Sequence, residues 1–370
     1  MNTLTRRGVL GLAATAAGCA ARKSQRSGVP SAPSITLAPV NVDRQRVIRT
    51  VAGLRPYRPS GFVVKTEALG RKTIVHNYGH GGAGITMSWG TADLAADQVA
   101  RAGSSKCAVL GCGVAGLSAA RLLQQRGFAV TIYAKDLPPF TTSNIAGGLW
   151  EPVSLFDPAG ATPEFQDQFV RAARFSHRYF QNLVGSYYGV RWIPLYSLSH
   201  DDFDPLSRSL HPIADLFPDA RSLSLSENPF PSPHAFRFWT MLIEPPIYLN
   251  ALLRDFQIAG GKLVVRELGN AGAIAGLQED IIVNCTGLGA KALFNDGELV
   301  PIKGQLSFLL PQPEVNYCTV GPGDLYMFPR TDGILLGGTH ERDVWTLDPD
   351  PAQTARILQG NRDLFSGMNR

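Results

Sequence analysis

The stretch KCAVLGCGVAGLSAARLLQQR, residues 106–126, decides the fold, because it predicts a buried strand, a glycine turn and a helix in direct succession. Residues 107–110 are a short apolar run, and the pattern GxGxxG follows at Gly111, Gly113 and Gly116. The first glycine permits a tight turn, the second lets the backbone approach a pyrophosphate, and the third lets helix and strand pack closely. The helix start then directs unpaired N–H groups at the phosphates. This stretch therefore predicts a dinucleotide-binding site.

A second predicted strand favours this interpretation over that of an ordinary glycine-rich loop. Residues 128–133 form the strand, which ends beside Lys135 and Asp136. These two residues follow the last glycine by about 20 positions, where a contact with the ribose of a dinucleotide is expected. Strand, turn, helix and strand in this order make a βαβ unit, which is the context that the motif requires.

Length and composition indicate a globular protein with room for two domains. The chain has 370 residues, of which 44% are hydrophobic, and this excludes a disordered protein. The net charge is +5, and an equal charge is contributed by five residues near the N-terminus: Arg6, Arg7, Arg22, Lys23 and Arg26. The remainder is near neutral, so the charge gives no indication of nucleic-acid binding.

The cysteines after residue 100 show no spacing typical of metal ligands. They are Cys107, Cys112, Cys285 and Cys318, and most fall in predicted strands or in the glycine turn. We interpret them as small buried residues that form neither disulfides nor metal sites.

The N-terminus predicts export. Residues 5–10, TRRGVL, form a twin-arginine pattern, and the weakly apolar run that follows to Ala21 is too short to span a bilayer. We therefore expect a signal segment at residues 1–21, a disordered linker rich in proline and serine at residues 22–41, and a periplasmic or cell-envelope location. Residues 16–19, AAGC, resemble a lipoprotein cleavage box, so Cys19 is either lipidated or discarded with an ordinary signal peptide.

The first folded block, residues 42–102, is expected to contain strands at 47–51, 62–65 and 74–76, followed by a helix at about 85–102. The sequence NYGHGGAG, residues 77–84, precedes this helix. Glycines at this density before a helix indicate that a ligand lies against bare backbone. In the rest of the chain we expect an antiparallel sheet within residues 190–240, helices at 164–184, 247–259 and 352–359, and strands at 263–265, 280–284, 305–310, 325–328 and 334–336.

Several of these motifs resemble the D-amino-acid oxidase family, which includes D-aspartate oxidase. The matching stretches cover most of the chain after residue 46 and read VLGCGVAGLSAARLL, DLPPFTTSNIAGGLWEP, IVNCTGLGA, KGQL, LYMFPRTDGILLGGT, GLRPYRP and HNYGHGGAGITMSWG. The order departs from that of the family, in which the GLRPYRP and HNYGHGG block closes the chain. The sequence thus resembles a circular permutation, with the family order given by residues 106–370 followed by 44–102.

The resemblance implies an α/β fold in which an FAD-binding, doubly wound domain is interleaved with a substrate domain built on a mixed or antiparallel sheet. Residues 103–160 would form the FAD-binding core and 261–300 the remainder of that domain. Residues 161–260 and 301–370 would belong mainly to the substrate domain, and residues 42–102 would contribute to both.

The resemblance also implies an activity and its site residues. Family members oxidise D-amino acids by hydride transfer to FAD, with release of a 2-oxo acid, ammonia and, through dioxygen, hydrogen peroxide. Arg55 matches the arginine that pairs with the substrate carboxylate, Tyr326 the tyrosine that contacts the same group, and Gly82 the glycine whose carbonyl receives the amino group. Besides Gly111 and Gly116 of the motif, the implied FAD contacts are Gly113, Val114, Lys135, Asp136, Thr141, Thr142, Gly147, Gly148, Leu149, Leu268, Thr286, Gly81, Gly82, Ala83, Gly84, Ile85 and Thr86.

Some features stay open at this level. A second active-site tyrosine of some members is Pro322 here, with Tyr317 as a possible substitute. His76 and His80 are weaker candidates for a catalytic role than for hydrogen bonds to backbone, and Arg58 is expected to be structural. Arg330 could meet the side chain of an acidic substrate or form a surface ion pair.

Three functions remain in view: a D-amino acid oxidase of broad or neutral preference, an oxidase for acidic D-amino acids, and a flavoprotein that passes electrons to an acceptor other than dioxygen. The sequence indicates no oligomeric state.

Overall fold

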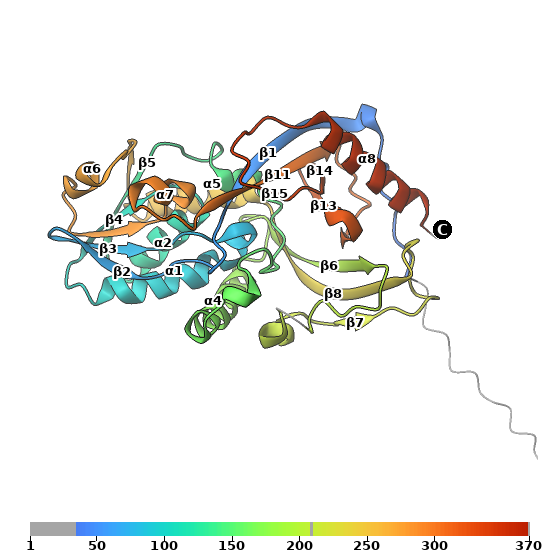
Figure 1. Ribbon diagram of the computed structural model, residues 1–370, viewed down its shortest axis with the longest axis horizontal. Coiled ribbons are helices and arrows are strands. Elements are labelled where there is room, and N and C mark those ends of the chain that lie inside the picture. Colours follow the sequence, from blue (N-terminus) through green and yellow to red (C-terminus); the bar gives the residue numbers. More distant parts are fainter. Residues whose placement is uncertain (1–34, 208–209, 369–370) are drawn as a thin grey trace, which may run out of the picture. The chain divides into compact units, whose positions relative to one another are not determined.

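The computed structural model describes residues 35–207 and 210–368 (Figure 1). The predicted signal segment, Cys19 and the first part of the predicted linker lie outside these residues. The described chain contains two β-sheets with helices packed against them, which confirms the predicted α/β fold class.

A six-stranded sheet carries the βαβ unit. Its strand order is β2-β3-β10-β4-β5-β9, and all neighbours are parallel except the β2–β3 hairpin. The strands are β2 (Thr66–Leu69), β3 (Lys72–His76), β4 (Lys106–Leu110), β5 (Ala129–Ala134), β9 (Lys262–Val265) and β10 (Ile281–Asn284). The strands β3, β10 and β4 are buried on both faces, which agrees with their continuous apolar sequence.

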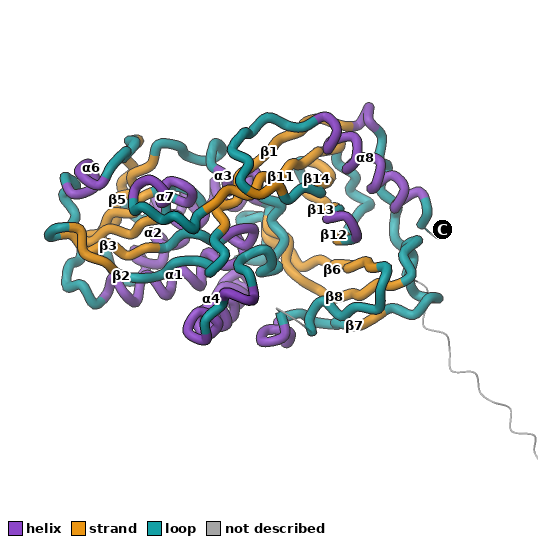
Figure 2. The backbone as a smooth tube through the Cα atoms, viewed as in Figure 1, coloured by secondary structure: helices purple, strands orange, loops and turns teal. Residues whose placement is uncertain are grey.

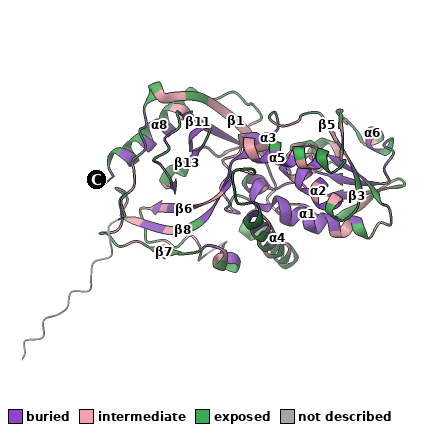
Figure 3. Cartoon of the chain, turned by 180° about the vertical axis from the view of Figure 1, so that it is seen from behind, coloured by how far each residue is buried: buried purple, intermediate pink, exposed green. Residues whose placement is uncertain are grey.

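Four long helices pack around this sheet and its border with the second one (Figure 2). They are α1 (Gly84–Ala100), α2 (Val114–Gln125), α4 (Pro163–Asn182) and α5 (Pro245–Ile258). Helix α1 contacts β3, α2 and α4, and residues 85–96 are all buried, as the purple α1 in Figure 3 shows. At Gly90, an added Cβ would lie 1.8 Å from the Ala172 carbonyl oxygen, so a glycine permits the close approach of α4.

The second sheet has nine strands and is mixed. Its order is β1-β11-β14-β13-β12-β6-β8-β7, with β15 also paired to β11, and only β12 and β6 are parallel. The strands are β1 (Val47–Tyr57), β6 (Val190–Ser199), β7 (Arg221–Ser222), β8 (His234–Ile243), β11 (Val300–Leu309), β12 (Cys318–Val320), β13 (Tyr326–Arg330), β14 (Gly333–Gly337) and β15 (Glu341–Arg342).

The remaining helices are short, apart from α8 (Pro351–Ser366), which packs on β11 and β14. They are α3 (Thr142–Ile145), α6 (Ala271–Ala275), α7 (Ala290–Leu293), and the 3-10 turns η1 (Arg44–Arg46), η2 (Gly81–Ala83), η3 (Pro158–Gly160), η4 (His211–Leu216), η5 (Gly287–Gly289) and η6 (Pro322–Asp324). No helix among the described residues is both long and apolar enough to cross a membrane.

Several local predictions differ from the structure. Strand β11 begins at Val300 and not at residue 305, and α8 continues past the predicted residue 359 to Ser366. Residues 62–65 do not form a strand: only Val63 makes a bridge, to Tyr78, and the regular strand is the following segment, β2. The apolar run reflected burial of the segment and not strand pairing, since Phe62, Val63 and Val64 are all buried. Strand β1 continues past the predicted residue 51 to Tyr57, because its backbone stays paired with β11 throughout.

The end of the predicted disordered linker is folded. Asn41 donates its backbone N–H to the Gln312 side chain at 2.8 Å, and the Tyr317 hydroxyl donates to the Ala38 carbonyl at 2.8 Å. Val40 is 4% exposed and belongs to an apolar cluster beneath α8. Residues 35–41 are therefore packed on the folded chain, because their few apolar side chains find partners that are distant in sequence.

The sequence blocks divide between the sheets as follows. From residues 42–102, β1 joins the larger sheet, while β2, β3 and α1 belong to the smaller one. From residues 161–260, β6, β7 and β8 join the larger sheet, but α4 and α5 pack on α1 and α2. The two sheets and their helices thus share one main apolar core.

We predict that Gly90→Ala destabilises the protein by about 1–3 kcal/mol, the usual cost of overpacking, because α1 and α4 would have to separate. The measurement is the free energy of unfolding in urea. Gly297→Ala is the control, since an added Cβ there meets no atom within 4 Å. Equal stability of the two variants would contradict the close contact at Gly90.

Candidate active site

A cavity of about 1050 Å³ lies where the carboxyl ends of β4, β5 and β10 meet the second sheet. Residues that are far apart in the sequence line it, including Arg55, Gly113, Thr286 and Tyr326. This position, outside the carboxyl ends of parallel strands, is the usual ligand site of open α/β sheets.

The glycine turn at one end of the cavity has the geometry that the motif predicted. Gly111 has φ 101°, and an added Cβ would lie 2.5 Å from the Cys285 carbonyl oxygen. At Gly116 an added Cβ would lie 2.0 Å from the Gly111 carbonyl oxygen, so this glycine sets the packing of α2 on the turn. Helix α2 begins after Gly113 without a side-chain cap, and its first turn faces the cavity. The first N–H group, that of Val114, donates to the Ser143 hydroxyl, and the positive end of the helix suits a phosphate.

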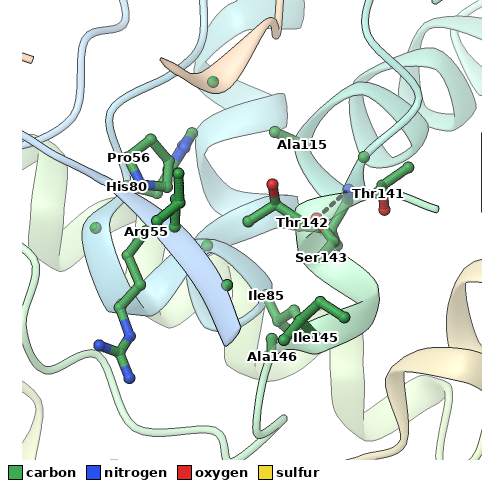
Figure 4. Close-up of a pocket in the computed structure, with 18 of the residues that line it drawn as sticks. Arg55, Pro56, His80, Ile85, Ala115, Thr141, Thr142, Ser143, Ile145 and Ala146 are labelled. Atoms are coloured by element: carbon green, nitrogen blue, oxygen red, sulfur yellow. Dashed lines mark hydrogen bonds between the residues drawn. The ribbon is translucent and has the colours of Figure 1, made fainter. Parts of the chain in front are cut away.

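The loop around α3 lines the cavity beside the glycine turn. Figure 4 shows Thr141, Thr142 and Ser143 on the side of the site opposite Arg55. The Ser143 hydroxyl accepts a hydrogen bond of 3.0 Å from the Val114 N–H, which joins this loop to the start of α2. The sequence analysis did not identify Ser143, and only its position between two threonines that line the site could have indicated it.

Nearly all of the predicted FAD contacts line this one cavity. The exceptions are Gly116, which packs helix on strand, and Ala83, which is fully buried in the turn before α1. Those that line it are Gly111, Gly113, Val114, Lys135, Asp136, Thr141, Thr142, Gly147, Gly148, Leu149, Leu268, Thr286, Gly81, Gly82, Gly84, Ile85 and Thr86.

The turn before α1 is held against the segment that follows Trp150. The Gly82 N–H donates to the Ser154 carbonyl at 2.9 Å, and an added Cβ on Gly81 would lie 2.3 Å from the same oxygen. The His80 ring lies 2.9 Å from the Thr91 hydroxyl, and burial lowers the pKa of His80 to about 4. His80 is therefore neutral. Its hydrogen-bond partner is the side chain of Thr91, whereas the sequence predicted a bond to the backbone.

Arg55, Gly82 and Tyr326 lie together at the other end of the cavity. The Arg55 side chain is 3.7 Å from the position of an added Gly82 Cβ, and its guanidinium lies near the Tyr326 hydroxyl and donates to the Thr339 carbonyl at 3.3 Å. Burial raises the pKa of the Tyr326 hydroxyl, and Arg55 partly offsets this shift. Figure 4 shows Arg55 across the cavity from Thr141 and Thr142.

Two further glycines make room for this pair. The Arg55 guanidinium lies on Gly304 of β11, where an added Cβ would be 2.4 Å away, and the Tyr326 ring lies on Gly337 of β14, where the distance would be 2.0 Å. Both side chains therefore lie flat on a neighbouring strand. No ion pair involves Arg55 among the described residues, which leaves its charge available to a ligand.

The other candidate cations are paired with carboxylates away from the cavity. Arg58 contacts Asp296 at 2.7 Å and is structural, as expected. Arg330 contacts Asp332 at 2.8 Å and donates to the Ala146 carbonyl, but its side chain is fully buried, so the alternative of a surface pair is wrong. His76 lies 3.0 Å from the Asn284 amide in the sheet, and burial lowers its pKa.

The suggested substitute for the second tyrosine is wrong. Tyr317 is fully buried in the cluster beneath α8, and neither it nor Pro322 lines the cavity. Phe203, Pro205 and Leu210, from the segment after β6, line it instead. This segment lacks periodicity in the sequence, so no signal indicated its role.

A carboxyl group that the sequence analysis did not consider also lines the cavity. Glu151 follows the fully buried Trp150, and burial raises the pKa of the Glu151 carboxyl to about 7. The motif GGLWEP contains this residue, but only the fold shows that it lines the site.

The residues present fit a flavin dinucleotide. The glycine turn exposes backbone at Gly111 and Gly113, and the start of α2 has no capping side chain from Gly113. Lys135 and Asp136 place polar groups where a ribose would lie. Within the described residues, no cluster of His, Cys, Asp or Glu is arranged to hold a metal ion.

We predict that Gly111→Ala abolishes flavin binding, because the added methyl group would collide with the Cys285 carbonyl at the turn. Gly127→Ala is the matched control: Gly127 also has positive φ, at 86°, but an added Cβ meets no atom within 4 Å. The control should lose only about 1 kcal/mol of stability from backbone strain. Flavin absorbance of the purified proteins is the measurement, and a yellow Gly111→Ala variant would contradict the prediction.

Comparisons with known proteins agree with this geometry. The chain is 32% identical to a D-amino-acid oxidase of Rubrobacter xylanophilus over 263 residues, which cover 69% of this chain and 76% of the relative. It is 29% identical to a D-aspartate oxidase of Homo sapiens over 264 residues, which cover 69% and 74%. Its fold is similar to that of an FAD-bound L-α-glycerophosphate oxidase from Mycoplasma pneumoniae, with a TM-score of 0.53, 16% identity, and coverage of 71% and 79%.

The family model described as FAD dependent oxidoreductase, DAO, matches residues 33–98 and 106–370. The match includes both the glycine turn before α2 and the turn before α1 that faces it across the cavity. FAD is therefore the cofactor that this cavity holds. We conclude that the chain belongs to the DAO family of FAD-dependent oxidoreductases.

Proposed function

We propose that this protein oxidises D-amino acids to 2-oxo acids and ammonia, with dioxygen as the acceptor and hydrogen peroxide as the second product. One observation carries the proposal: the guanidinium of Arg55 has no carboxylate partner among the described residues and faces the cavity beside Tyr326 and Gly82. The similarity to a D-amino-acid oxidase and a D-aspartate oxidase supports the same substrate class.

In this proposal the protein contributes orientation. The planar guanidinium of Arg55 grips the substrate carboxylate with two hydrogen bonds, the Tyr326 hydroxyl donates a further one, and the Gly82 carbonyl accepts one from the amino group. When bound, FAD supplies the hydride acceptor. These three contacts fix the Cα–H bond of the substrate in one direction, which is the source of rate and of the preference for one enantiomer.

No described residue is assigned as a catalytic base. His80 is neutral and bonded to Thr91, and His76 is buried within the sheet. The substrate amine would thus react in its neutral form. The geometry favours no acceptor over another, and dioxygen is proposed because the curated relatives are named oxidases.

We also propose that the chain is a circular permutant of its family. The family model matches in two stretches with residues 99–105 between them, and this interval contains residues 101–105, where a permuted chain would join the two blocks. The contact of the Arg362 side chain with the Val42 carbonyl, at 3.1 Å, supports adjacent ends of the two blocks. A gene that encodes residues 106–370 followed by 44–102 should then give a yellow, active protein. A colourless product would count against the permutation.

Export by the twin-arginine route to the periplasm or cell envelope is a further proposal, with lipidation of Cys19 as a variant of it. Both rest on residues 1–21, which lie outside the described residues. Replacing Arg6 and Arg7 by lysine should retain the protein in the cytoplasm, and fractionation of the producing cells would measure this.

We predict that Arg55→Ala lowers kcat/KM for D-amino acids by about two to three orders of magnitude while FAD stays bound. Removing one partner of a desolvated charge pair costs about 2–5 kcal/mol. The kcat/KM of Arg55→Lys should lie between those of Arg55→Ala and the wild type, because an ammonium keeps the charge but loses the paired hydrogen bonds. Normal turnover by Arg55→Ala would place the carboxylate anchor elsewhere.

The experiment that tests the function is anaerobic bleaching of the flavin spectrum by a panel of D- and L-amino acids. We expect bleaching by D-amino acids and none by their L-enantiomers, followed by recovery of the yellow colour and peroxide release when air is admitted. Bleaching without recovery in air would favour another electron acceptor.

A further inference from the structure

The segment that carries Glu151 is fixed beside the proposed reaction centre. The Leu149 carbonyl accepts a hydrogen bond of 3.2 Å from the Thr86 hydroxyl at the start of α1. The backbone N–H of Trp150 donates to the Met241 carbonyl at 2.8 Å. Two residues after Glu151, the Val153 carbonyl oxygen lies 3.5 Å from the position of an added Gly82 Cβ. Glu151 is thus held between the helix start and the turn that would receive the substrate amine.

Glu151 lines the cavity, while the side chain of its neighbour Trp150 is buried in the core. The Trp150 ring is fully buried and packs against His177 and Phe217. Glu151 lines the cavity and lies near enough to Cys318 of β12 to interact with it electrostatically. Strand β12 also presents Val320 to the cavity, and its partner in register on β6 is Ser197, which lines the same wall.

The Glu151 carboxyl has no hydrogen bond or ion pair in the described part of the chain. The nearby arginine on β6, Arg191, is paired with Glu244 and the Pro329 carbonyl and does not line the cavity. Glu151 is half-buried, and a partly desolvated carboxyl group without a cation is costly to ionise, so burial raises its pKa to about 7. A ligand cation beside it would favour the ionised form and remove this cost.

Once Arg55 is paired with the α-carboxylate of a substrate, the acidic residues at this end of the cavity would outnumber its remaining cations. The cation that would take the α-carboxylate is Arg55, and the remaining acids are Glu151 and Asp324, which lies near Tyr326 and His340. Burial lowers the pKa of His340, which favours its neutral form. The other cations of the lining, Lys135 and Arg266, belong to the end where β5 and β9 finish.

We propose that Glu151 binds the cationic side chain of the substrate, so that the preferred substrates are D-amino acids with an amine or guanidinium at the end of the side chain. This inference rests on the proposed function and specifies its substrate class. An acidic side chain would meet Glu151 and Asp324 as like charges, and Lys135 and Arg266, the described arginine and lysine residues of the lining besides Arg55, lie at the other end of the cavity.

The first test compares substrates of matched length on the wild-type protein with FAD bound. D-Lysine and D-norleucine differ mainly in the terminal ammonium, and D-glutamate supplies the opposite charge. We expect kcat/KM to be at least about tenfold higher for D-lysine than for D-norleucine, equivalent to about 1.4 kcal/mol, and lower still for D-glutamate. Equal or better turnover of D-norleucine or D-glutamate would overturn the inference.

The second test changes the charge alone. Glu151→Gln should reduce the ratio of kcat/KM for D-lysine over D-norleucine by about tenfold, since the amide keeps the shape but not the charge. Glu314→Gln is the matched control, because Glu314 is exposed and lies outside the cavity, and it should leave the ratio unchanged. If Glu151→Gln lowers turnover of both substrates equally, Glu151 serves the reaction on every substrate and the inference is wrong.

The outcomes also separate this inference from the proposed function. If the yellow wild-type protein is reduced by no D-amino acid, the proposed function itself fails. If it oxidises D-norleucine as well as D-lysine, the proposed function holds and only the assignment of Glu151 fails. The wild-type comparison decides this even if Glu151→Gln does not fold.

Discussion

The pairing of β10 with both β3 and β4 is the interaction on which the site depends. Since the three strands are parallel, the turns that follow them emerge at one edge of the sheet: the turn before α1, the glycine turn before α2 and the turn after Asn284. Two of these turns are separated only by α1 and β4, whereas the third comes from much later in the chain. Without this register, the bare backbone of Gly82 and that of Gly111 would not face one cavity.

The second sheet adds the groups that would handle a substrate. From Arg49 to Tyr57, strand β1 lies antiparallel to β11 in continuous register, and this brings Arg55 over Gly304. Tyr326 lies over Gly337 on the neighbouring pair of strands. A glycine beneath each side chain lets the guanidinium and the ring lie flat against the sheet, so both are held in place without a carboxylate that would neutralise Arg55. The arginines with structural roles, Arg58 and Arg330, are paired instead.

Much of this site could be predicted from the sequence, because its backbone geometry depends on residues that are close together in the chain. The GxGxxG turn, the glycine-rich turn before α1 and the loop from Thr141 to Leu149 were all recognisable, and they line the same cavity. The errors arose where apolar character was interpreted without its partners. Phe62 and its neighbours are buried without forming a strand, and Tyr317 is a core residue bonded to Ala38 and not a lid.

The sequence by itself determined the dinucleotide turn and the α/β architecture, because each follows from local spacing of glycines and apolar residues, while FAD was implied by the resemblance of the motifs to a family. Only the tertiary structure decided which charged groups remain free. Whether an arginine is neutralised or available depends on the carboxylates that long-range strand pairing brings near it, and the order of residues along the chain does not specify these distances. For this reason the sequence could not show that, among the described residues, Arg330 is paired with a carboxylate and Arg55 is not. Nor could the motif GGLWEP show that Glu151 lines the cavity without an ion pair among the described residues.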